Sequence, residues 1–369
     1  MVQFSGLLAF YASLCIANAD ILQENSKDCD CYVTNGSSSA YFLYRRFFDF
    51  RNIPNSNGVY NLEPPNVTSS QDAGGELGQK GYLNSTVFAD DWELQTWGRT
   101  PRPTTLLRMQ NSKQSIYIQD NSKEDNSNAT TFLTLRTYRN QQFSSTAEML
   151  GLQRNVFHAS IRIYARVHGV PGAVIGMFTY LNDSTESDIE ILTRDQINHV
   201  RCSNQATIGP DGYTIPGASS DVTLPSPVVW TNWNIYCLDW LPGLSSWYVN
   251  ESLVLNKTYG VPKLPSCLDI NVWSDGSDWS GNMSVGSAAY LDIQWIEMVF
   301  NTSGPRHGYP TENNEKRNLE RRSGPCKRVC SVDDVERIGI PVRSEAPTTV
   351  VVWSFSCCIW LLAAAIIWA

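Results

Sequence analysis

The sequence predicts an all-β fold, built as a sandwich or barrel of many strands. Charged residues make up 17% of the 369 residues and aromatic residues 11%, turn-forming residues are frequent, and long helical stripes are scarce. This composition is typical of a β domain with many turns. Runs that alternate apolar and polar residues, separated by turn residues, indicate a series of strands. The net charge of −8 argues against a nucleic-acid partner, which would need a basic face.

The predicted strands follow one another along the middle of the chain. In one run Ile161, Ile163 and Val167 fall on the same side, and the next run is β-branched and aromatic. A Leu241-Pro242-Gly243 turn between two further runs predicts a hairpin. The expected strands are 131–137, 158–168, 173–180, 234–240, 246–249 and 290–300, the last alternating over its whole length. In contrast, 111–130 is rich in Asn, Ser and Asp and predicts a surface loop.

The segment Glu186-Ser187-Asp188-Ile189-Glu190 carries a carboxylate at every second position. In a strand, alternate side chains share a face, so the three acids would project together while Ser187 and Ile189 point into the core. Neighbouring acids repel one another and lose solvation, so such a row indicates a function. Its natural use is sugar chemistry, in which one carboxylate attacks and another donates a proton.

A helix is the alternative for this segment. Ser184-Thr185-Glu186 could cap a helix whose buried stripe is Ile189, Leu192 and Ile197, and the acids would then be a solvated first turn. The two strand-like runs before the segment favour the strand.

Both ends of the chain predict targeting segments. An apolar stretch from Leu7 to Ile16 precedes Ala17-Asn18-Ala19, which predicts a signal peptide at 1–19, cleaved after Ala19. The tail at 350–369 is uncharged, mostly apolar and long enough to span a membrane. No Lys or Arg follows it, which favours a lipid-anchor signal that is removed during attachment. A single membrane span is the alternative.

Sequons and cysteines agree with a secretory route. Nine Asn-x-Ser/Thr sites imply glycosylated surface loops, and they lie at Asn35, Asn66, Asn84, Asn128, Asn182, Asn250, Asn256, Asn282 and Asn301. Seven cysteines remain outside the two end segments: Cys29, Cys31, Cys202, Cys237, Cys267, Cys326 and Cys330. Disulfides are expected in this compartment, at least one thiol stays free because the count is odd, and the connectivity is not readable from sequence.

Four regions are therefore expected. They are the signal at 1–19, a strand-rich body at 20–303, a polar and mostly disordered linker at 304–349, and the hydrophobic tail at 350–369. Cys326 and Cys330 interrupt the linker and could close a small local loop.

Three linked motifs resemble family-16 glycoside hydrolases of the fungal cell-surface type. They are Glu186-Ser-Asp-Ile-Glu190, Leu238-Asp-Trp240 with Trp247-Tyr-Val249, and Asn271-Val-Trp273 with Asp278-Trp279-Ser-Gly281. The resemblance covers roughly 80–303 and implies a two-sheet antiparallel β-sandwich, the concanavalin A-like jelly roll. Ser187 stands where the family usually has an apolar residue, and Asn234 replaces a common His, which leaves substrate preference open.

The resemblance implies a role for each acid. Glu186 would be the nucleophile, Glu190 the general acid and then base, and Asp188 the group that keeps the two glutamates in different ionisation states. Strand positions four apart are about 13 Å apart at Cα, whereas retaining carboxyls lie about 5–5.5 Å apart. The strand must therefore curve so that the outer side chains lean inward.

Asn271, Trp273 and Trp279 are the candidate substrate-binding residues. A Trp face matches the C–H face of a pyranose, although either Trp could instead be core, since Trp is largely buried on average. The histidines are scattered and no metal site is predicted. Some relatives carry a structural calcium ion, but the sequence identifies no ligands for one, and no cofactor is expected.

The predicted function is an extracellular retaining endo-β-glucanase, anchored at the cell surface or cell wall, that acts as a monomer on β-glucan. A transglycosylase, in which a second sugar replaces water, is a close alternative. A non-catalytic β-glucan-binding lectin is the alternative from another class, because the fold does not fix function. The linkage cleaved is not readable from the sequence.

Overall fold

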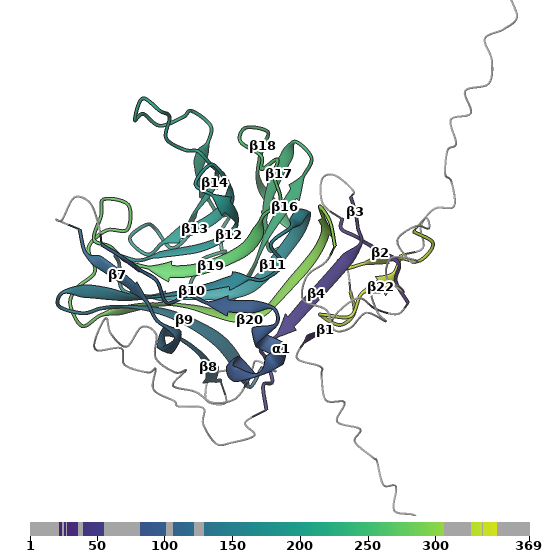
Figure 1. Cartoon of the computed structure of the whole chain (residues 1–369), viewed down its shortest axis with the longest axis horizontal. Coiled ribbons are helices and arrows are strands. Elements are labelled where there is room, and N and C mark those ends of the chain that lie inside the picture. The colour runs from purple at the N-terminus through teal and green to yellow at the C-terminus, as the bar shows by residue number, and fades with distance from the viewer. Residues whose placement is uncertain are drawn as a thin grey trace, which may run out of the picture.

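The computed structural model describes residues 22–23, 26, 28–35, 40–54, 82–100, 106–121, 129–305, 326–333 and 335–344. The predicted signal peptide and hydrophobic tail lie outside these residues. Within them the fold is a two-sheet β-sandwich, mostly antiparallel, which confirms the predicted fold class (Figure 1). The helical segments of the described residues are the short helix α1 (Thr86–Ala89) and two turns of 3₁₀ helix at Tyr82–Asn84 and Lys113–Ser115.

The front sheet carries the row of acids. Its strands, in spatial order, are β5 (Trp92–Leu94), β10 (Phe143–Gly151), β19 (Cys267–Trp273), β12 (Val174–Asn182), β13 (Thr185–Leu192), β14 (His199–Asn204) and β15 (Ser219–Thr223). All of these pairs are antiparallel. In this order β13 has four strands on one side and two on the other.

The back sheet is centred on the longest strand, β20 (Ala288–Thr302). One edge of β20 pairs with β9 (Thr131–Arg139) and then β4 (Tyr44–Asp49), and its other edge begins the series β11 (Val156–Gly169), β16 (Asn234–Leu241), β17 (Leu244–Val249) and β18 (Ser252–Lys257). Flanking strands are β1 (Leu22–Gln23), β6 (Gly98–Arg99), β7 (Arg108–Asn111) and β8 (Ile116–Asp120). Strand β10 joins the sheets, because its first half pairs with β7 and β9 and its second half with β19 and β5.

The core between the sheets follows from the alternation in the sequence. Ile189 of the front sheet and Ile161 and Ile163 of the back sheet are each no more than 4% exposed and belong to one cluster. Burying each such side chain contributes about 1.5–3 kcal/mol. The predicted hairpin is also confirmed, since Leu241 pairs with Leu244 across Pro242-Gly243.

Two expectations about strands are wrong in part. The alternation of 290–300 is interrupted, because the β11–β20 register shifts between Tyr164 and Ala165, and the buried apolar residues change from Leu291 and Ile293 to Ile296 and Met298. After such a bulge, the residues that point into the core are the even-numbered ones instead of the odd-numbered ones, because one extra residue has been inserted into the strand. The predicted loop at 111–130 contains strand β8, which pairs with β9. Ile116, Tyr117 and Ile118 of this strand are buried.

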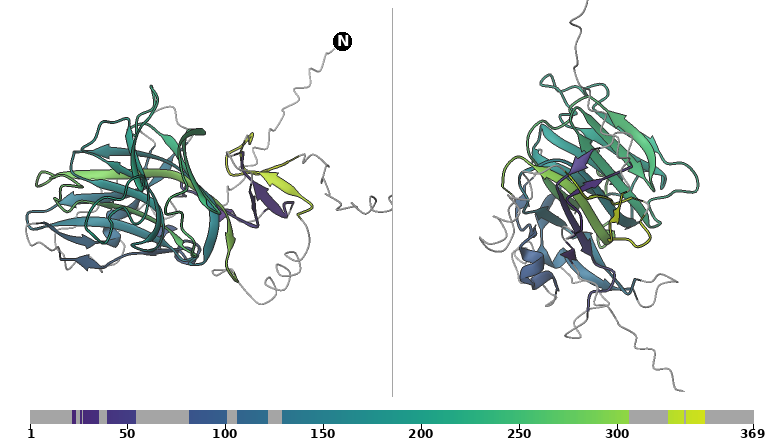
Figure 2. Two further views of the ribbon diagram at one scale, coloured as in Figure 1. Left: turned by 90° about the horizontal axis from the view of Figure 1, so that it is seen from above. Right: turned by 90° about the vertical axis from the view of Figure 1, so that its right-hand side faces the viewer.

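Part of the predicted linker is ordered and returns to the N-terminal region. We call residues 326–333 and 335–344 the C-terminal strap. Its strands β21 (Val329–Ser331) and β22 (Val342–Arg343) form a small sheet with β2 (Cys31–Val33) and β3 (Tyr41–Phe42), beside β4 in Figure 1 and separate from the front sheet in Figure 2. Disulfides Cys29–Cys330 and Cys31–Cys326 fasten it, so the local loop between Cys326 and Cys330 does not form.

Candidate active site

The acid row lies on β13 as a strand, which rules out the helix alternative. Cross-strand pairing sets Glu186 opposite Tyr180, Asp188 opposite Phe178 and Glu190 opposite Gly176 of β12. On the other face of β13, Ser187 is fully buried and Ile189 is part of the core. The three carboxylates therefore occupy the outer face of the front sheet, as the alternation predicts.

Asp188 is the most deeply placed of the three acids, at 2% exposure. The Gln205 side-chain amide donates to Asp188 Oδ2 at 3.2 Å. Burial raises the pKa of Asp188 well above its usual range, and the charges of Glu186 and Glu190 raise it further. These effects favour the protonated form of Asp188, which reduces the repulsion between the outer glutamates.

The two outer glutamates differ in their surroundings. Burial raises the pKa of Glu190 to about 7, with a further increase from Glu186, while a hydrogen bond from Trp279 and the charge of Arg201 oppose the shift. Burial also raises the pKa of Glu186, with a contribution from Asp183. Glu190 is therefore suited to hold a proton near neutral pH and to lose it when its surroundings change.

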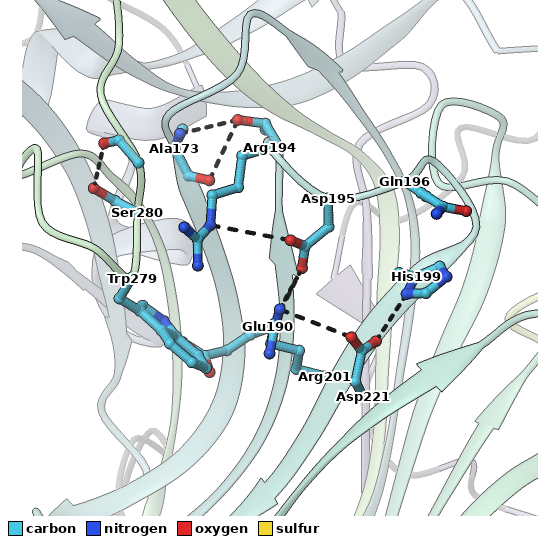
Figure 3. Close-up of polar contacts among 12 residues, drawn as sticks. Ala173, Glu190, Arg194, Asp195, Gln196, His199, Arg201, Asp221, Trp279 and Ser280 are labelled. Atoms are coloured by element: carbon cyan, nitrogen blue, oxygen red, sulfur yellow. Dashed lines mark hydrogen bonds and ion pairs between the residues drawn. The ribbon is translucent and has the colours of Figure 1, made fainter.

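Trp279 reaches Glu190 from the loop that follows β19. Its indole Nε1 donates to Glu190 Oε1 at 3.3 Å, and the ring is 36% exposed (Figure 3). The buried Asp275 holds this loop by accepting from the Ser277 backbone at 3.0 Å and the Ser280 hydroxyl at 3.1 Å. Gly281 closes the loop with a φ of +80°, a backbone conformation that favours glycine.

Asn271 and Trp273 lie on β19, on the face that bears the acids. Asn271 is opposite Gly176 of β12, and Gly176 is in turn opposite Glu190 of β13. Because glycine has no side chain, no side chain of β12 stands between Asn271 and Glu190 at this position. The Asn271 side-chain oxygen is buried and has no hydrogen-bond partner among the described residues. Trp273 is partly buried, opposite Val174. The structure thus brings Asn271 and Trp279 to the acid row, with Trp273 farther along β19.

The strand pairing also brings to this face residues that the sequence reading missed. Phe178 and Tyr180 of β12 are partly exposed beside the acids. Glu148 of β10 lies opposite Asn271 and accepts from Asn111 at 2.9 Å and from the Trp97 indole at 3.2 Å. The signal that could have found the two aromatic residues is their alternation within 173–180, because that run is adjacent to the acid strand.

Asp269 is a further missed acid, two residues before Asn271 on β19. Burial raises its pKa well above the usual range, and Glu148 and Glu186 add to the increase. Its Oδ1 atom has no hydrogen-bond partner among the described residues. Asp269 therefore adds a fourth carboxyl that lies near the acid row.

The second motif, Leu238-Asp239-Trp240 with Trp247, has a structural role. Trp240 and Trp247 are both fully buried, and the Trp240 indole donates to the Pro262 carbonyl at 3.0 Å. Asn234 is also buried and donates to the carbonyls of Val229 and Asn232. These residues belong to the back sheet, so the replacement of the usual His by Asn234 lies away from the acids.

No metal is assigned to the described part of the chain. It contains no group of three or more His, Cys, Asp or Glu side chains arranged to hold a metal ion. The described residues also contain no helix long and apolar enough to cross a membrane.

A carboxylate row on the outer face of one sheet of a sandwich is the arrangement that the resemblance to family-16 glycoside hydrolases predicts. The chain is 29% identical to the β-glucanase of Paenibacillus polymyxa over 138 residues, which is 35% of this chain and 54% of that protein. It is 26% identical to the β-glucanase of Paenibacillus macerans over 138 residues, with the same coverage. These relatives confirm the resemblance to β-glucanases. The chain spans about half the length of each, and no protein-family model matches it.

Solved structures with a similar arrangement include two glucanases. The Bacillus licheniformis β-glucanase is 16% identical to this chain, and the superposition has a TM-score of 0.45. It includes 57% of this chain and 92% of the glucanase. The laminarinase catalytic domain from Thermotoga maritima is 16% identical, covers 60% of this chain and 95% of its own, and gives a TM-score of 0.46.

Proposed function

We propose that this protein is a retaining endo-β-glucanase that hydrolyses β-glucan by double displacement. The observation that carries the proposal is the Glu186, Asp188 and Glu190 row, in which the buried Asp188 separates the two glutamates and the Trp279 indole donates to Glu190. The β-glucanase names of the Paenibacillus relatives support β-glucan as the substrate class.

In the first step, the Glu186 carboxylate attacks the anomeric carbon and the bond to the leaving sugar oxygen breaks. Glu190 donates its proton to that oxygen, so the leaving group departs as an alcohol. The attack forms a covalent ester between Glu186 and the sugar. Asp188 reduces the repulsion within the row, because its raised pKa favours its neutral form.

In the second step, the same pair of glutamates releases the sugar. Esterified Glu186 no longer carries a charge, so its contribution to the raised pKa of Glu190 disappears. Glu190, now ionised, removes a proton from water, whose oxygen attacks the anomeric carbon and displaces Glu186. Two inversions retain the configuration at that carbon.

A panel of β-glucans incubated with the full chain tests the proposal, with Glu186→Gln as the control. We expect the wild type to release reducing ends from a β-1,3- or mixed-linkage glucan, and the variant to lose about 10⁴-fold or more in rate at an unchanged melting temperature. Binding without release of reducing ends from any glucan would indicate a lectin. Products longer than the starting oligomer would indicate a transglycosylase.

We also propose that the protein acts at the cell surface after passing through the secretory pathway. Two disulfides support an oxidising compartment, and the apolar segment at 350–369 supports attachment to a membrane. We expect phospholipase to release the full-length form from intact cells if a lipid anchor holds it. Retention after this treatment, with release on deleting 350–369, would favour a membrane span.

A further inference from the structure

Arg201 of β14 is the direct cross-strand neighbour of Glu190. Its guanidinium carbon lies 4.9 Å from the centre of the Trp279 ring, the same ring whose Nε1 donates to Glu190 Oε1 at 3.3 Å (Figure 3). Arg201 thus covers a face of the indole while the edge of the indole contacts the acid. Stacking of a guanidinium on Trp is a favourable cation–π arrangement.

Two carboxylates hold Arg201 in this place. Its Nη2 atom lies 2.8 Å from Asp195 Oδ2 and 3.8 Å from Asp221 Oδ2, and Asp221 in turn contacts His199 Nδ1 at 3.0 Å. Figure 3 shows Arg201 between Asp195 and Asp221, with His199 beyond Asp221. The two carboxylates and the indole together therefore hold the guanidinium in place.

This arrangement argues against a direct role for Arg201 in binding an anionic substrate. Its side chain is 20% exposed, and two carboxylates already neutralise its charge. An anionic sugar would have to displace one of them.

We propose that Arg201 is a positioning residue for the acid/base Glu190, because its guanidinium holds the Trp279 ring so that the indole N–H meets the Glu190 carboxylate. The inference rests on the proposed function, in which Glu190 changes its protonation state between the two steps. The titratable groups that face Glu190 are Glu186 and Asp188 on its own strand and Arg201 on β14, while its β12 neighbour is Gly176.

The Arg201 and Trp279 contacts serve the second step more than the first. Both favour the ionised form of Glu190, and both lower its pKa against the effect of burial. Glu190 must be protonated when the leaving group departs but ionised when water attacks. Without the two contacts a smaller fraction of Glu190 would be ionised, so the covalent intermediate would accumulate.

Steady-state and burst kinetics of full-length Arg201→Gln on an activated aryl β-glycoside test this inference. Such a leaving group needs little protonation, so we expect a normal burst followed by turnover at least ~10-fold slower. Added azide, which needs no base, should restore turnover. On soluble β-glucan, whose leaving oxygen needs the Glu190 proton, the alkaline limb of the kcat/KM profile should move up by about 0.5–1 pH unit. Trp279→Phe, which keeps an aromatic ring but lacks the N–H, should move it the same way.

Arg194→Gln is the matched control. Arg194 also approaches Asp195, with Nε at 4.0 Å from Oδ1, and its side chain is 38% exposed. Among the described residues, no hydrogen bond, ion pair or cation–π contact joins it to Trp279 or Glu190. We expect its pH profile to match the wild type. Arg201→Lys, which keeps the charge without the planar stack, should fall between wild type and Arg201→Gln.

Equal loss at every pH, with an unmoved alkaline limb and no rescue by azide, would overturn the positioning role. A readout that needs no turnover separates this result from failure of the proposed function. The ¹³C signal of the Glu190 carboxyl, assigned from its absence in Glu190→Gln, should titrate at higher pH in Arg201→Gln. If the wild type is inactive but the Glu190 titration still moves in Arg201→Gln, the proposed enzymatic function is wrong and the positioning contact is supported. An unmoved titration would remove the inference itself.

Discussion

Glu186 and Glu190 have the same side chain, and in the proposed mechanism their different surroundings give them different catalytic roles. The pKa of both is raised by burial, that of Glu190 to about 7. Because the nucleophile must be ionised and the acid protonated, we expect a bell-shaped kcat/KM profile. Its alkaline limb should lie near pH 7, and its acid limb should lie above about 4.3, the usual Glu value. Initial rates on a soluble β-glucan between pH 4 and 9 check both limbs, and a profile still rising at pH 9 would contradict the assignment.

The raised pKa of Glu190 also affects stability, with a defined sign. The folded protein binds this proton more tightly than the unfolded chain, whose Glu pKa is about 4.3. Stability is therefore lost as pH rises from there through about 7, the folded value. We expect Glu190→Gln to be about 3–4 kcal/mol more stable than wild type at pH 8 and nearly equal at pH 4. Urea unfolding at the two pH values measures the difference, and an equal effect at both would exclude the linkage.

Replacing Glu190 by Ala should separate its role from that of Glu186. We expect the variant to be inactive on ordinary β-glucan, since the leaving oxygen is not protonated, but active on an activated aryl glycoside with azide. The product should be a β-glycosyl azide, because two displacements retain configuration. Proton NMR of the anomeric position distinguishes the products. An α-azide would reverse the roles of the two glutamates.

The sequence predicts the acid row at the residue scale because a single period places all three acids on one face. Arg201 was missed for a physical reason, since its partners come from separate parts of the chain. Its contact with Trp279 spans two strands and a loop, and no local pattern specifies which side chains meet on a sheet. Asp269 and Asn271 share a face by the same alternation, but only the pairing of β19 with β12 places them near the acids.

At the scale of elements, alternation predicts strands well where it is unbroken. The strand predicted at 158–168 lies within β11, and the 173–180 run largely coincides with β12. The bulge in β20 was not predicted, because Trp295 continues the apolar phase of Leu291 and Ile293 in the sequence. Strand β8 was missed because the polar residues around it predict a loop, whereas tertiary pairing with β9 decides its structure.

Gly176 shows how one strand shapes the site that its neighbours form. A Cβ atom at this position would lie 2.7 Å from Asn271 Oδ1 and 3.1 Å from Phe178 Cε1. Both are side-chain atoms, which can move without unfolding the sheet. We expect Gly176→Ala to lower kcat/KM about 10–100-fold while shifting the melting temperature by only a few degrees.

Michaelis–Menten kinetics and thermal melting of the same preparation check this prediction. Gly304→Ala is the control, because its Cβ would lie 3.7 Å from Asn155 Nδ2, an ordinary contact distance. A large loss of stability with little change in kcat/KM would show that Gly176 serves the strand and not the site.

At the scale of the whole molecule, the C-terminal strap closes the chain on itself. Arg162 of β11 pairs with Asp333 of the strap at 2.8 Å, and Arg45 of β4 donates to the Gly339 carbonyl at 2.6 Å. These contacts lie on the outer face of the back sheet, since Ile161 and Ile163 on either side of Arg162 point into the core. A cavity of about 200 Å³ remains between the strap and this face. Neither the pairing nor the cavity was predictable, because a polar, charged segment has the composition of a linker.

The two disulfides of the strap enclose nearly the same loop, with sequence separations of 301 and 295. Once one is formed, the other closes only a short ring. Loop-closure entropy then makes the second bridge worth about 2 kcal/mol and the first about 5 kcal/mol at most. We therefore expect strongly non-additive effects. Removing Cys31–Cys326 by paired Ala substitutions should cost about 2 kcal/mol, and so should removing Cys29–Cys330.

Removing both bridges should cost far more than twice that amount, up to about 7 kcal/mol. Because the strap lies on the sheet opposite the acid row, each single-bridge variant should keep its kcat/KM on β-glucan at 25 °C while melting earlier. Guanidinium unfolding and initial rates on the wild type and the three variants give the double-mutant cycle. Additive losses would mean that the bridges constrain independent loops, and a loss of kcat/KM in a folded variant would mean that the strap is coupled to the acid row.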